Sequence, residues 1–266
     1  MNILEEITRS KREELTVRKG MVTHAELAGS RYFRQPARSL IRSLVHNPQF
    51  GIIAEIKKGS PTKGRFMQVC DPAEIAKMYE DAGAAAISVL TDEKYFYGSL
   101  RDLESVRAHT SLPLLRKDFI IDEFQIFEAK ASGADAVLLI AGILDKHQLS
   151  DLHSAAQELG LEALIELYES REIDNINFDR MKLIGINNRD LKTFTTDIQR
   201  TIQIASLLPG DIHVVSESGI STVGDLKILR KAGIRSALIG ETFMTSGHPG
   251  ETLRMMLDGF IHADKS

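Results

Sequence analysis

The sequence feature that most constrains the fold is a passage from a helix, through a glycine, into a short apolar run. A glycine just past a helix end accepts the left-handed conformation that closes the helix. Each such passage therefore predicts that a helix returns the chain to a β-strand. The passages are "DAGAAAISVL" (81–90), "ASGADAVLLI" (131–140), "ELGLEALIEL" (158–167) and "KAGIRSALIG" (231–240).

Short runs rich in Ile, Val and Leu alternate with amphipathic stretches of helical length from residue 51 onward. Their bodies are largely hydrophobic, as expected of parallel strands covered on the outside and packed on the inside. Consecutive runs begin about 20 to 35 residues apart, so each period holds one strand and one helix. The eight runs are "GIIAEIK" (51–57), "AAISVLT" (85–91), "LPLLRKDF" (112–119), "DAVLLIA" (135–141), "LEALIEL" (161–167), "KLIGINN" (182–188), "IHVVSES" (212–218) and "SALIGET" (236–242).

Eight strand–helix units over roughly 210 residues match the α/β class and, within it, the (β/α)8 TIM barrel in number, order and length. We predict this barrel over residues 49–266, preceded by a helical extension over residues 1–48 that packs on it, with a single domain overall. The alternative is a doubly wound open sheet. That sheet would need fewer strands and a glycine-rich phosphate turn after the first one, and "GSPTKG" (59–64) lacks the GxGxxG spacing.

The extension is predicted to be helical throughout. Its first helix is expected in "NILEEITRSKREELTVRK" (2–19), and a second helical region in "AELAGSRYFRQPARSLIRSLV" (25–45), interrupted at Pro36. An amphipathic extension must bury its apolar stripe somewhere. We therefore expect residues 1–48 to pack over the mouth of the barrel and to help retain the substrate.

The composition narrows the class of partner and compartment. A formal net charge of −4 and a pI of about 6.1 predict no nucleic acid and no membrane as partner. The single Cys70 excludes an internal disulfide and a cysteine-built metal site, and it fits a reducing compartment. The N-terminal residues are charged from position 5 onward, unlike a secretory signal. We expect a cytoplasmic monomer that binds a small molecule.

Polar residues gather where the predicted strands end. In a (β/α)8 barrel the active site lies at the carboxyl ends of the strands. A solvent-facing loop would explain any one of these residues equally well, but the strand starts are mostly Gly, Ala, Leu and Ile. The polar ends comprise Glu55 and Lys57, then Arg116, Lys117 and Asp118, then Glu166, then Asn187, Asn188 and Arg189, then Ser216, Glu217 and Ser218, and finally Gly240 and Glu241.

Lysines and glutamates dominate this set, and that mixture predicts acid–base chemistry. Glu55 and Lys57 are two residues apart, so in a strand they point to the same side as Ile53. That side of the strand either faces solvent or lines a site. Nearby opposite charges keep one another ionised, while burial favours the neutral forms, and this balance supplies a proton donor and an acceptor near pH 7. No histidine ends a strand and none has metal-ligand spacing, so we expect no metal.

Three turns predict a phosphate site. Gly219 follows the seventh run and Gly240 ends the eighth, each close to a helix start, where backbone amides can bind an anion. The loops after strands seven and eight are where barrels commonly hold phosphate. Ser60 adds a hydroxyl just after the first strand, which neighbours the eighth once the barrel closes.

Taken together, the motifs resemble the indole-3-glycerol phosphate synthase family of tryptophan biosynthesis. The resemblance covers roughly residues 3–260, and its most specific parts are the first, second and fourth motifs below. The motifs are "IIAEIKKGSPTKG" (52–64), "LPLLRKDFIID" (112–122), "LEALIEL" (161–167), "IGINNRDLKTF" (184–194), "VSESGIS" (215–221) and "ALIGETFM" (237–244).

The resemblance implies a carbon–carbon lyase (a carboxy-lyase) that needs no cofactor and no metal. It would close the ring of 1-(2-carboxyphenylamino)-1-deoxyribulose 5-phosphate, with loss of CO₂ and water, to give indole-3-glycerol phosphate. Lys117 would be the general acid that protonates the substrate carbonyl, and Glu166 its partner in proton transfer. Glu55 and Lys57 would form a second acid–base pair.

The same resemblance implies roles for the other residues. The remaining catalytic residues would position the substrate by hydrogen bonds; they are Asn187, Glu217 and Ser218. The substrate-binding residues would hold the phosphate (Ser60, Gly219, Gly240 and the Glu241 backbone amide), wall the aromatic ring (Phe119, Leu138, Leu191 and Ile239) and orient the site (Arg189). Glu241 stands where some relatives carry Ser or Thr, so its carboxylate is expected to turn away from the phosphate.

Two other functions are left open. An isomerase acting on another ribulose phosphate would keep the barrel and the phosphate site, but it is expected to use Asp, or Cys with Asp, as acid and base. A non-catalytic scaffold would lack one or more of Lys57, Lys117 and Glu166, all of which are present.

Overall fold

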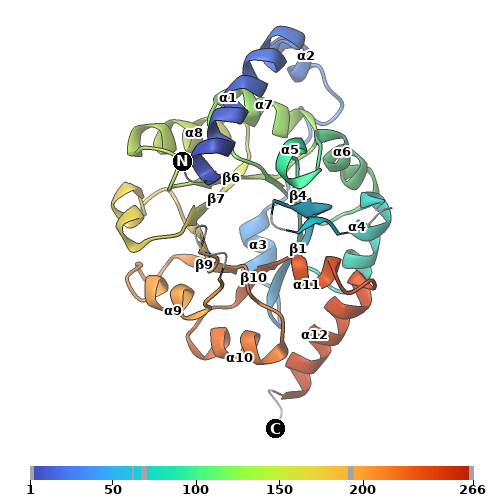
Figure 1. Ribbon diagram of the computed structural model, residues 1–266, viewed down its shortest axis with the longest axis vertical. Helices are drawn as coiled ribbons and strands as arrows, with labels where there is room; N and C mark the ends of the chain where they lie inside the picture. The colour runs from blue at the N-terminus through green and yellow to red at the C-terminus, as the bar shows by residue number, and fades with distance from the viewer. Residues whose placement is uncertain (1–2, 62, 67–70, 191–194, 264–266) are drawn as a thin grey trace.

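Eight parallel strands close into a barrel in the computed structural model, which describes residues 3–61, 63–66, 71–190 and 195–263 (Figure 1). The order around the ring is β1-β10-β9-β8-β7-β6-β5-β4, and β4 pairs with β1 to complete it. The predicted (β/α)8 fold is thereby confirmed. The barrel strands are β1 (Gly51–Ile56), β4 (Ala86–Leu90), β5 (Leu114–Lys117), β6 (Ala136–Ile140), β7 (Glu162–Leu167), β8 (Leu183–Asn187), β9 (His213–Glu217) and β10 (Ser236–Ile239).

Helices surround the ring and return the chain between strands. The unit after β7 differs from expectation, because a 3-10 helix, η1 (Ser170–Asn175), takes the place of an α-helix. A small hairpin, β2 (Gly59–Ser60) with β3 (Gly64–Arg65), is inserted after β1. The α-helices of the barrel are α4 (Pro72–Asp81), α5 (Glu93–Phe96), α6 (Leu100–His109), α7 (Glu123–Ala131), α8 (Lys146–Glu158), α9 (Gln199–Ala205), α10 (Val223–Lys231), α11 (Glu241–Met244) and α12 (Pro249–Ala263).

The strand alternation divides the core into two layers. Ile53 of β1 lies in the cluster inside the barrel, together with Leu115, Leu138 and Leu164 of other strands. Its neighbours Ile52, Ala54 and Ile56 belong to the larger cluster between strands and helices. Glu55 and Lys57 share the inner side with Ile53, so they continue the inner face toward the carboxyl end of the barrel.

The N-terminal extension holds three helices, α1 (Ile3–Met21), α2 (His24–Ala28) and α3 (Leu40–Val45). The expected second helical region is therefore broken over residues 29–39. Thr23 caps the start of α2 in a capping box and Gly29 caps its end, while Ser39 caps α3 by accepting the Arg42 N–H. These local side-chain and glycine caps stop one helix and start the next, with Pro36 between them.

The expectation that the whole extension covers the mouth is corrected by α3, which closes the opposite end of the barrel. Leu40 and Leu44 of α3 are buried in the inner cluster. The Ser39 hydroxyl and the Ile41 amide donate to the carboxylate of Glu162, at the start of β7. The apolar side of α3 is therefore buried at the starts of the strands. Of the three described helices of the extension, only α1 reaches the mouth.

Candidate active site

A cavity of about 340 Å³ opens at the carboxyl ends of the strands. Two predicted site residues do not line it: Glu217 lies just behind it, in contact with Lys117, and Leu191 is outside the described residues. Among the other polar strand ends, Arg116, Asn188 and Ser216 are buried outside its lining. All other residues assigned to catalysis or substrate binding line this cavity. They are Glu55, Lys57, Ser60, Lys117, Phe119, Leu138, Glu166, Asn187, Arg189, Ser218, Gly219, Ile239, Gly240 and Glu241.

Lys117 ends β5 and lies between two carboxylates from other strands. Its Nζ donates to Oε2 of Glu217 and lies 3.3 Å from Oε2 of Glu166. Asn187 donates to the other oxygen of Glu166 at 3.0 Å. Burial alone would lower the pKa of Lys117, but Glu217 and Glu166 raise it above its ordinary value. The lysine therefore enters the cavity as a charged, proton-bearing group.

Glu217 is the most enclosed carboxylate of the site, with 1% of its surface exposed. Burial raises its pKa to about 8, although the charge of Lys117 opposes that shift. Its Oε1 is buried, accepts no hydrogen bond within the part of the chain that the structure describes, and lies against Gly185 of β8, where any side chain would overlap it. Gly185 thus makes the space in which Glu217 can reach Lys117.

The second lysine–glutamate pair lies on β1 and at its end. Nζ of Lys57 is 3.2 Å from Oε1 of Glu55, and both side chains are largely buried. Gly240 packs against Glu55 so closely that a Cβ there would overlap the carboxylate. The aromatic ring of Phe66 lies 5.8 Å from Nζ of Lys57. The two charges are therefore an inner-face pair at the rim, in keeping with their spacing in the sequence.

The turn after β9 has two successive residues in the left-handed conformation. Ser218 and Gly219 have φ values of 66° and 74°, in the left-handed region. This conformation is uncommon for a serine, and Asn188 supports it by donating to the Ser218 carbonyl at 3.0 Å. Buried Asn188 also bonds Ser216 and Thr201, so the turn is held from behind. Ser60 and Gly240 line the cavity together with this turn.

The Glu241 carboxylate forms two ion pairs at the rim. It accepts a hydrogen bond from Nζ of Lys63, and its Oε2 accepts from Nη2 of Arg189 at 3.0 Å. Burial would raise its pKa, but Lys63 and Arg189 hold it below the ordinary value. Glu241 thereby links the turn before β3 to the segment after β8.

Sequence reasoning placed the N-terminal extension at the mouth, but it did not name the side chains that reach the cavity from outside the strand ends. Ile3, Leu4 and Ile7 of α1 line it, and no strand-end rule could place a residue so distant in sequence. Glu172 of η1 also lines it, and burial raises the pKa of its carboxyl, which accepts the Tyr168 and Glu169 amides. The sequence does contain a signal for Glu172, because a run of polar residues directly follows β7.

Other kinds of site and setting were also sought. Among the described residues, no group of three or more His, Cys, Asp and Glu side chains is arranged to hold a metal ion. Nor does any helix there combine the length and the apolar character that crossing a bilayer requires.

The fold and the cavity define a (β/α)8-barrel enzyme with lysine–glutamate pairs at the carboxyl ends of its strands. A family model described as indole-3-glycerol phosphate synthase matches residues 4–256. The chain belongs to this family, as its motifs predicted, and it is a carboxy-lyase of tryptophan biosynthesis.

Similar proteins with the same name, "Indole-3-glycerol phosphate synthase", come from several bacteria. The protein of Bacteroides thetaiotaomicron is 46% identical over 96% of this chain and 98% of its own length. That of Rhodopirellula baltica is 45% identical over 92% and 94%, respectively. That of Salinibacter ruber is 44% identical over 97% of both chains.

Proposed function

We propose that this cavity binds 1-(2-carboxyphenylamino)-1-deoxyribulose 5-phosphate and converts it to indole-3-glycerol phosphate, CO₂ and water. The observation that carries the proposal is the position of Lys117, a charged acid held between two buried carboxylates at the carboxyl end of the barrel. Ring closure needs a proton donor at the substrate carbonyl, and dehydration then needs a donor and an acceptor.

Lys117 is the general acid of the first step. It gives a proton to the carbonyl oxygen while the substituted aromatic carbon attacks the carbonyl carbon, so that one C–C bond forms. The carboxyl group then leaves that aromatic carbon as CO₂, and its bonding electrons restore the ring. Glu166 supports this role, because its charge keeps Lys117 protonated until substrate arrives, and Glu217 accepts a hydrogen bond from the same ammonium group.

Glu166 takes part in the dehydration. The new hydroxyl group leaves as water after it receives a proton, and a second proton is lost to form the indole double bond. Glu166 is 3.3 Å from Lys117 and accepts from Asn187, so a proton can pass between the lysine and the carboxylate. Asn187, Glu217 and Ser218 position the groups that exchange these protons.

Lys57 and Glu55 interact with the carboxylate on the aromatic ring of the substrate or with its phosphate. Their 3.2 Å pair places an ammonium group at the rim, where it can meet either anion of the substrate. Arg189, at the end of β8, orients the substrate from the facing side. The ammonium groups suit a substrate that carries both a carboxylate and a phosphate.

Phosphate and aromatic ring occupy opposite ends of the cavity in this proposal. The turn at Ser218 and Gly219, with Gly240, the Glu241 amide and Ser60, holds the phosphate. Phe119, Leu138 and Ile239 wall the aromatic ring, and Ile3, Leu4 and Ile7 of α1 extend that wall. Leu191, predicted for the same wall, keeps that proposed role.

The quaternary and cellular setting completes the proposal. We propose a cytoplasmic monomer without cofactor or metal, in which residues 1–48 and the barrel of residues 49–266 act as a single domain. α3 inside the barrel end supports this unity, since its leucines share the inner core.

The decisive experiment is turnover of the anthranilate-derived substrate by the purified chain in a chelating buffer, followed by indole fluorescence. We expect product to form without added metal and in proportion to the enzyme. Absence of product from folded protein, or restoration only by a metal ion, would overturn the proposal.

A further inference from the structure

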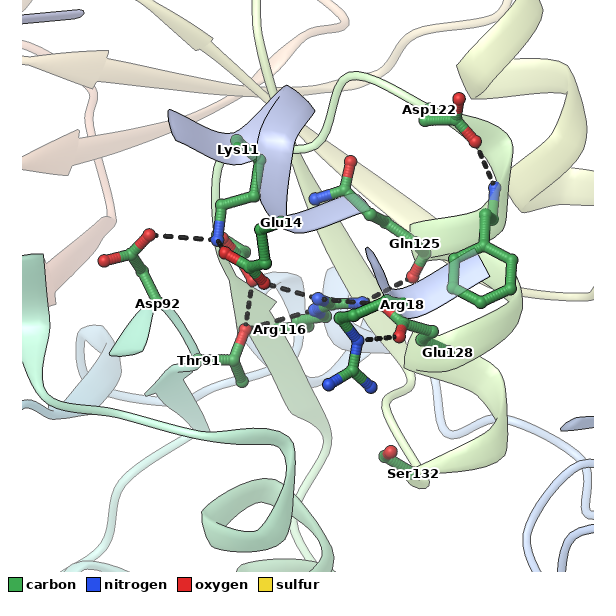
Figure 2. A network of polar contacts seen from close by, with 12 residues as sticks. Lys11, Glu14, Arg18, Thr91, Asp92, Arg116, Asp122, Gln125, Glu128 and Ser132 are labelled. Carbon is green, nitrogen blue, oxygen red and sulfur yellow. Dashed lines mark hydrogen bonds and ion pairs between the residues drawn. The ribbon is translucent and has the colours of Figure 1, made fainter. Parts of the chain in front are cut away.

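The N-terminal helix buries a lysine next to the strand that carries Lys117. Lys11 of α1 is 1% exposed, and its Nζ lies 2.8 Å from Glu14, 2.9 Å from Asp92 and 3.0 Å from Asp118 (Figure 2). A buried ammonium is stable only when it is paired and hydrogen-bonded. The carboxylates of Glu14, Asp92 and Asp118 supply that pairing, and Asp92 and Asp118 belong to the barrel.

Asp118 is the barrel residue that links this cation to the active site. It follows Lys117 directly, and its Oδ1 accepts from the Phe119 amide at 2.8 Å as well as from Lys11. Its Oδ2 accepts from the Thr91 hydroxyl at 2.7 Å and from Arg116 at 2.9 Å. Asp118 is therefore hydrogen-bonded through both oxygens, and one of these bonds holds the backbone next to Lys117.

The residue before Lys117 is fixed in the same network. Nη1 of Arg116 donates to the Gln125 carbonyl at 2.6 Å, and the guanidinium also pairs with Glu128 (Figure 2). The same guanidinium pairs with Asp118. Side chains alternate along a strand, so Arg116 points away from the cavity that Lys117 enters. Asp118, just past the end of β5, lines that cavity too, and its carboxylate contacts Arg116, Thr91 and Lys11. Lys117 thus lies in the chain between two residues, Arg116 and Asp118, whose positions depend on the balance of one buried network of charges.

That balance is incomplete without α1. Asp92 and Asp118 have side chains only 2% and 1% exposed, and Glu128 is equally enclosed. Burial would raise the pKa of Asp118, but Arg116 and Lys11 overcome this and hold it below its ordinary value. Without Lys11, Arg116 would be the remaining cation beside Asp118 while it still shares Glu128 with Arg18, and Asp92 would lose its ion pair.

We propose that Lys11 is a positioning residue, which acts through Asp118 to fix the end of β5 and, with it, Lys117 and Phe119. Docking of α1 therefore does more than cover the cavity, because it completes the charge balance that holds the acid in place. This inference rests on the proposed role of Lys117 as the general acid.

The first test compares two lysines of the same helix. Lys19 forms an ion pair with Asp122 at 2.7 Å, so Lys19→Met removes an equal charge and an anchor of α1 without touching Asp118. We expect Lys11→Met to lower kcat/KM about tenfold or more, since small misplacements of reacting groups can cost up to about 10²-fold. Lys19→Met should stay within about twofold of wild type, and Lys11→Arg within about threefold, because each keeps a cation beside Asp118.

A second variant approaches Asp118 from the barrel. Thr91→Val removes the 2.7 Å hydrogen bond to Oδ2 of Asp118 and the 3.1 Å hydrogen bond that Nε of Arg116 donates to the Thr91 hydroxyl, with little change in volume. It changes no residue of α1. We expect kcat/KM to fall about three- to tenfold while α1 keeps its wild-type resistance to protease. This variant decides the question if Lys11→Met does not fold.

Equal losses in Lys11→Met and Lys19→Met, or a Thr91→Val variant within about twofold of wild type, would overturn the inference. The wild-type chain must turn over in the same assay. Its inactivity would refute the proposed function instead, so the two failures are distinguishable.

Discussion

The two ends of the barrel bury charges in different ways. At the end that α3 closes, Asp135 accepts from the backbone amides of Arg38 and Leu114, each at 2.8 Å, and from Arg107 at 2.6 Å. Every hydrogen bond that holds this carboxylate comes from a fixed backbone group or a buried guanidinium. Such a group ties segments together, and both of its oxygens already accept hydrogen bonds from the protein.

At the mouth the charged groups are held mostly by one another. Lys117 of β5 is held by Glu166 of β7 and Glu217 of β9, and Oε1 of Glu217 accepts no hydrogen bond from the described residues. These groups keep hydrogen-bonding capacity that a substrate can use. The difference indicates that buried charge at one end serves stability and at the other end serves chemistry, although both look alike in composition.

The largest expected effect is at the mouth. Lys117→Ala should lower kcat by about 10²-fold or more, the usual scale for a positioned acid, while folding and ligand binding are largely retained. Indole fluorescence measures the rate, and circular dichroism with phosphate titration checks fold and binding. A folded variant with near-normal kcat would remove Lys117 from its role.

The matching change at the closed end should show the reverse pattern. Asp135→Ala leaves Arg107 buried and uncompensated, and two backbone amides lose their acceptor. Breaking a buried pair in this way costs about 3–5 kcal/mol of unfolding free energy. Urea denaturation should show that loss, while kcat of the folded fraction stays within about twofold. A large fall in kcat at unchanged stability would break the contrast between the two ends.

Much of the fold could be predicted, because strand signals are local. The runs at 51–57 and 135–141 enclose β1 and β6 to within a residue at either end, since hydrophobic bodies and glycine-capped returns are properties of short segments. The polar strand ends were visible for the same reason. Once the ring closes, residues at those ends must come together, so Lys117 and Glu166 could be placed side by side before any coordinates existed.

What could not be predicted depends on contacts between distant segments. The sequence of α3 is amphipathic whether it covers the mouth or closes the other end, and only its contacts with Glu162 and the inner core decide. Lys11 reads as an ordinary helix-surface lysine, because its carboxylate partners Asp92 and Asp118 are about a hundred residues away. Periodicity assigns a face to each helix but does not identify what covers that face.

Truncations of the N-terminal extension test this comparison, because the extension contacts both ends of the barrel. Removing residues 1–22 takes away Ile3, Leu4 and Ile7 from the cavity wall, so we expect KM to rise about tenfold as buried apolar contacts with the substrate are lost. Removing residues 1–48 also takes away α3, and the barrel should then lose much of its stability because Leu40 and Leu44 leave the inner core. Steady-state kinetics and thermal unfolding of both truncations provide the measurement. An unchanged KM in the shorter truncation would mean that α1 does not help retain the substrate.

The smallest expected effect concerns Glu241, a mouth carboxylate whose ion pairs are partly exposed. Its oxygens engage Lys63 and Arg189, so a phosphate that approaches the rim meets cations already balanced by the protein. Glu241→Gln keeps the shape and the backbone amide but removes that competing charge. Because exposed pairs are worth at most about 1 kcal/mol, inorganic phosphate should bind about three times more tightly.

The matched control lies at the other end of the barrel, where Asp211 pairs with Lys182 at 2.5 Å. Asp211→Asn makes the same change in net charge far from the cavity and should leave phosphate binding unaltered. The gain from Glu241→Gln should also shrink as salt is added, because screening weakens interactions between exposed charges. Weaker phosphate binding in Glu241→Gln would show instead that the carboxylate is needed to hold the rim together. In that case the mouth would resemble the closed end, with its charge serving structure before chemistry.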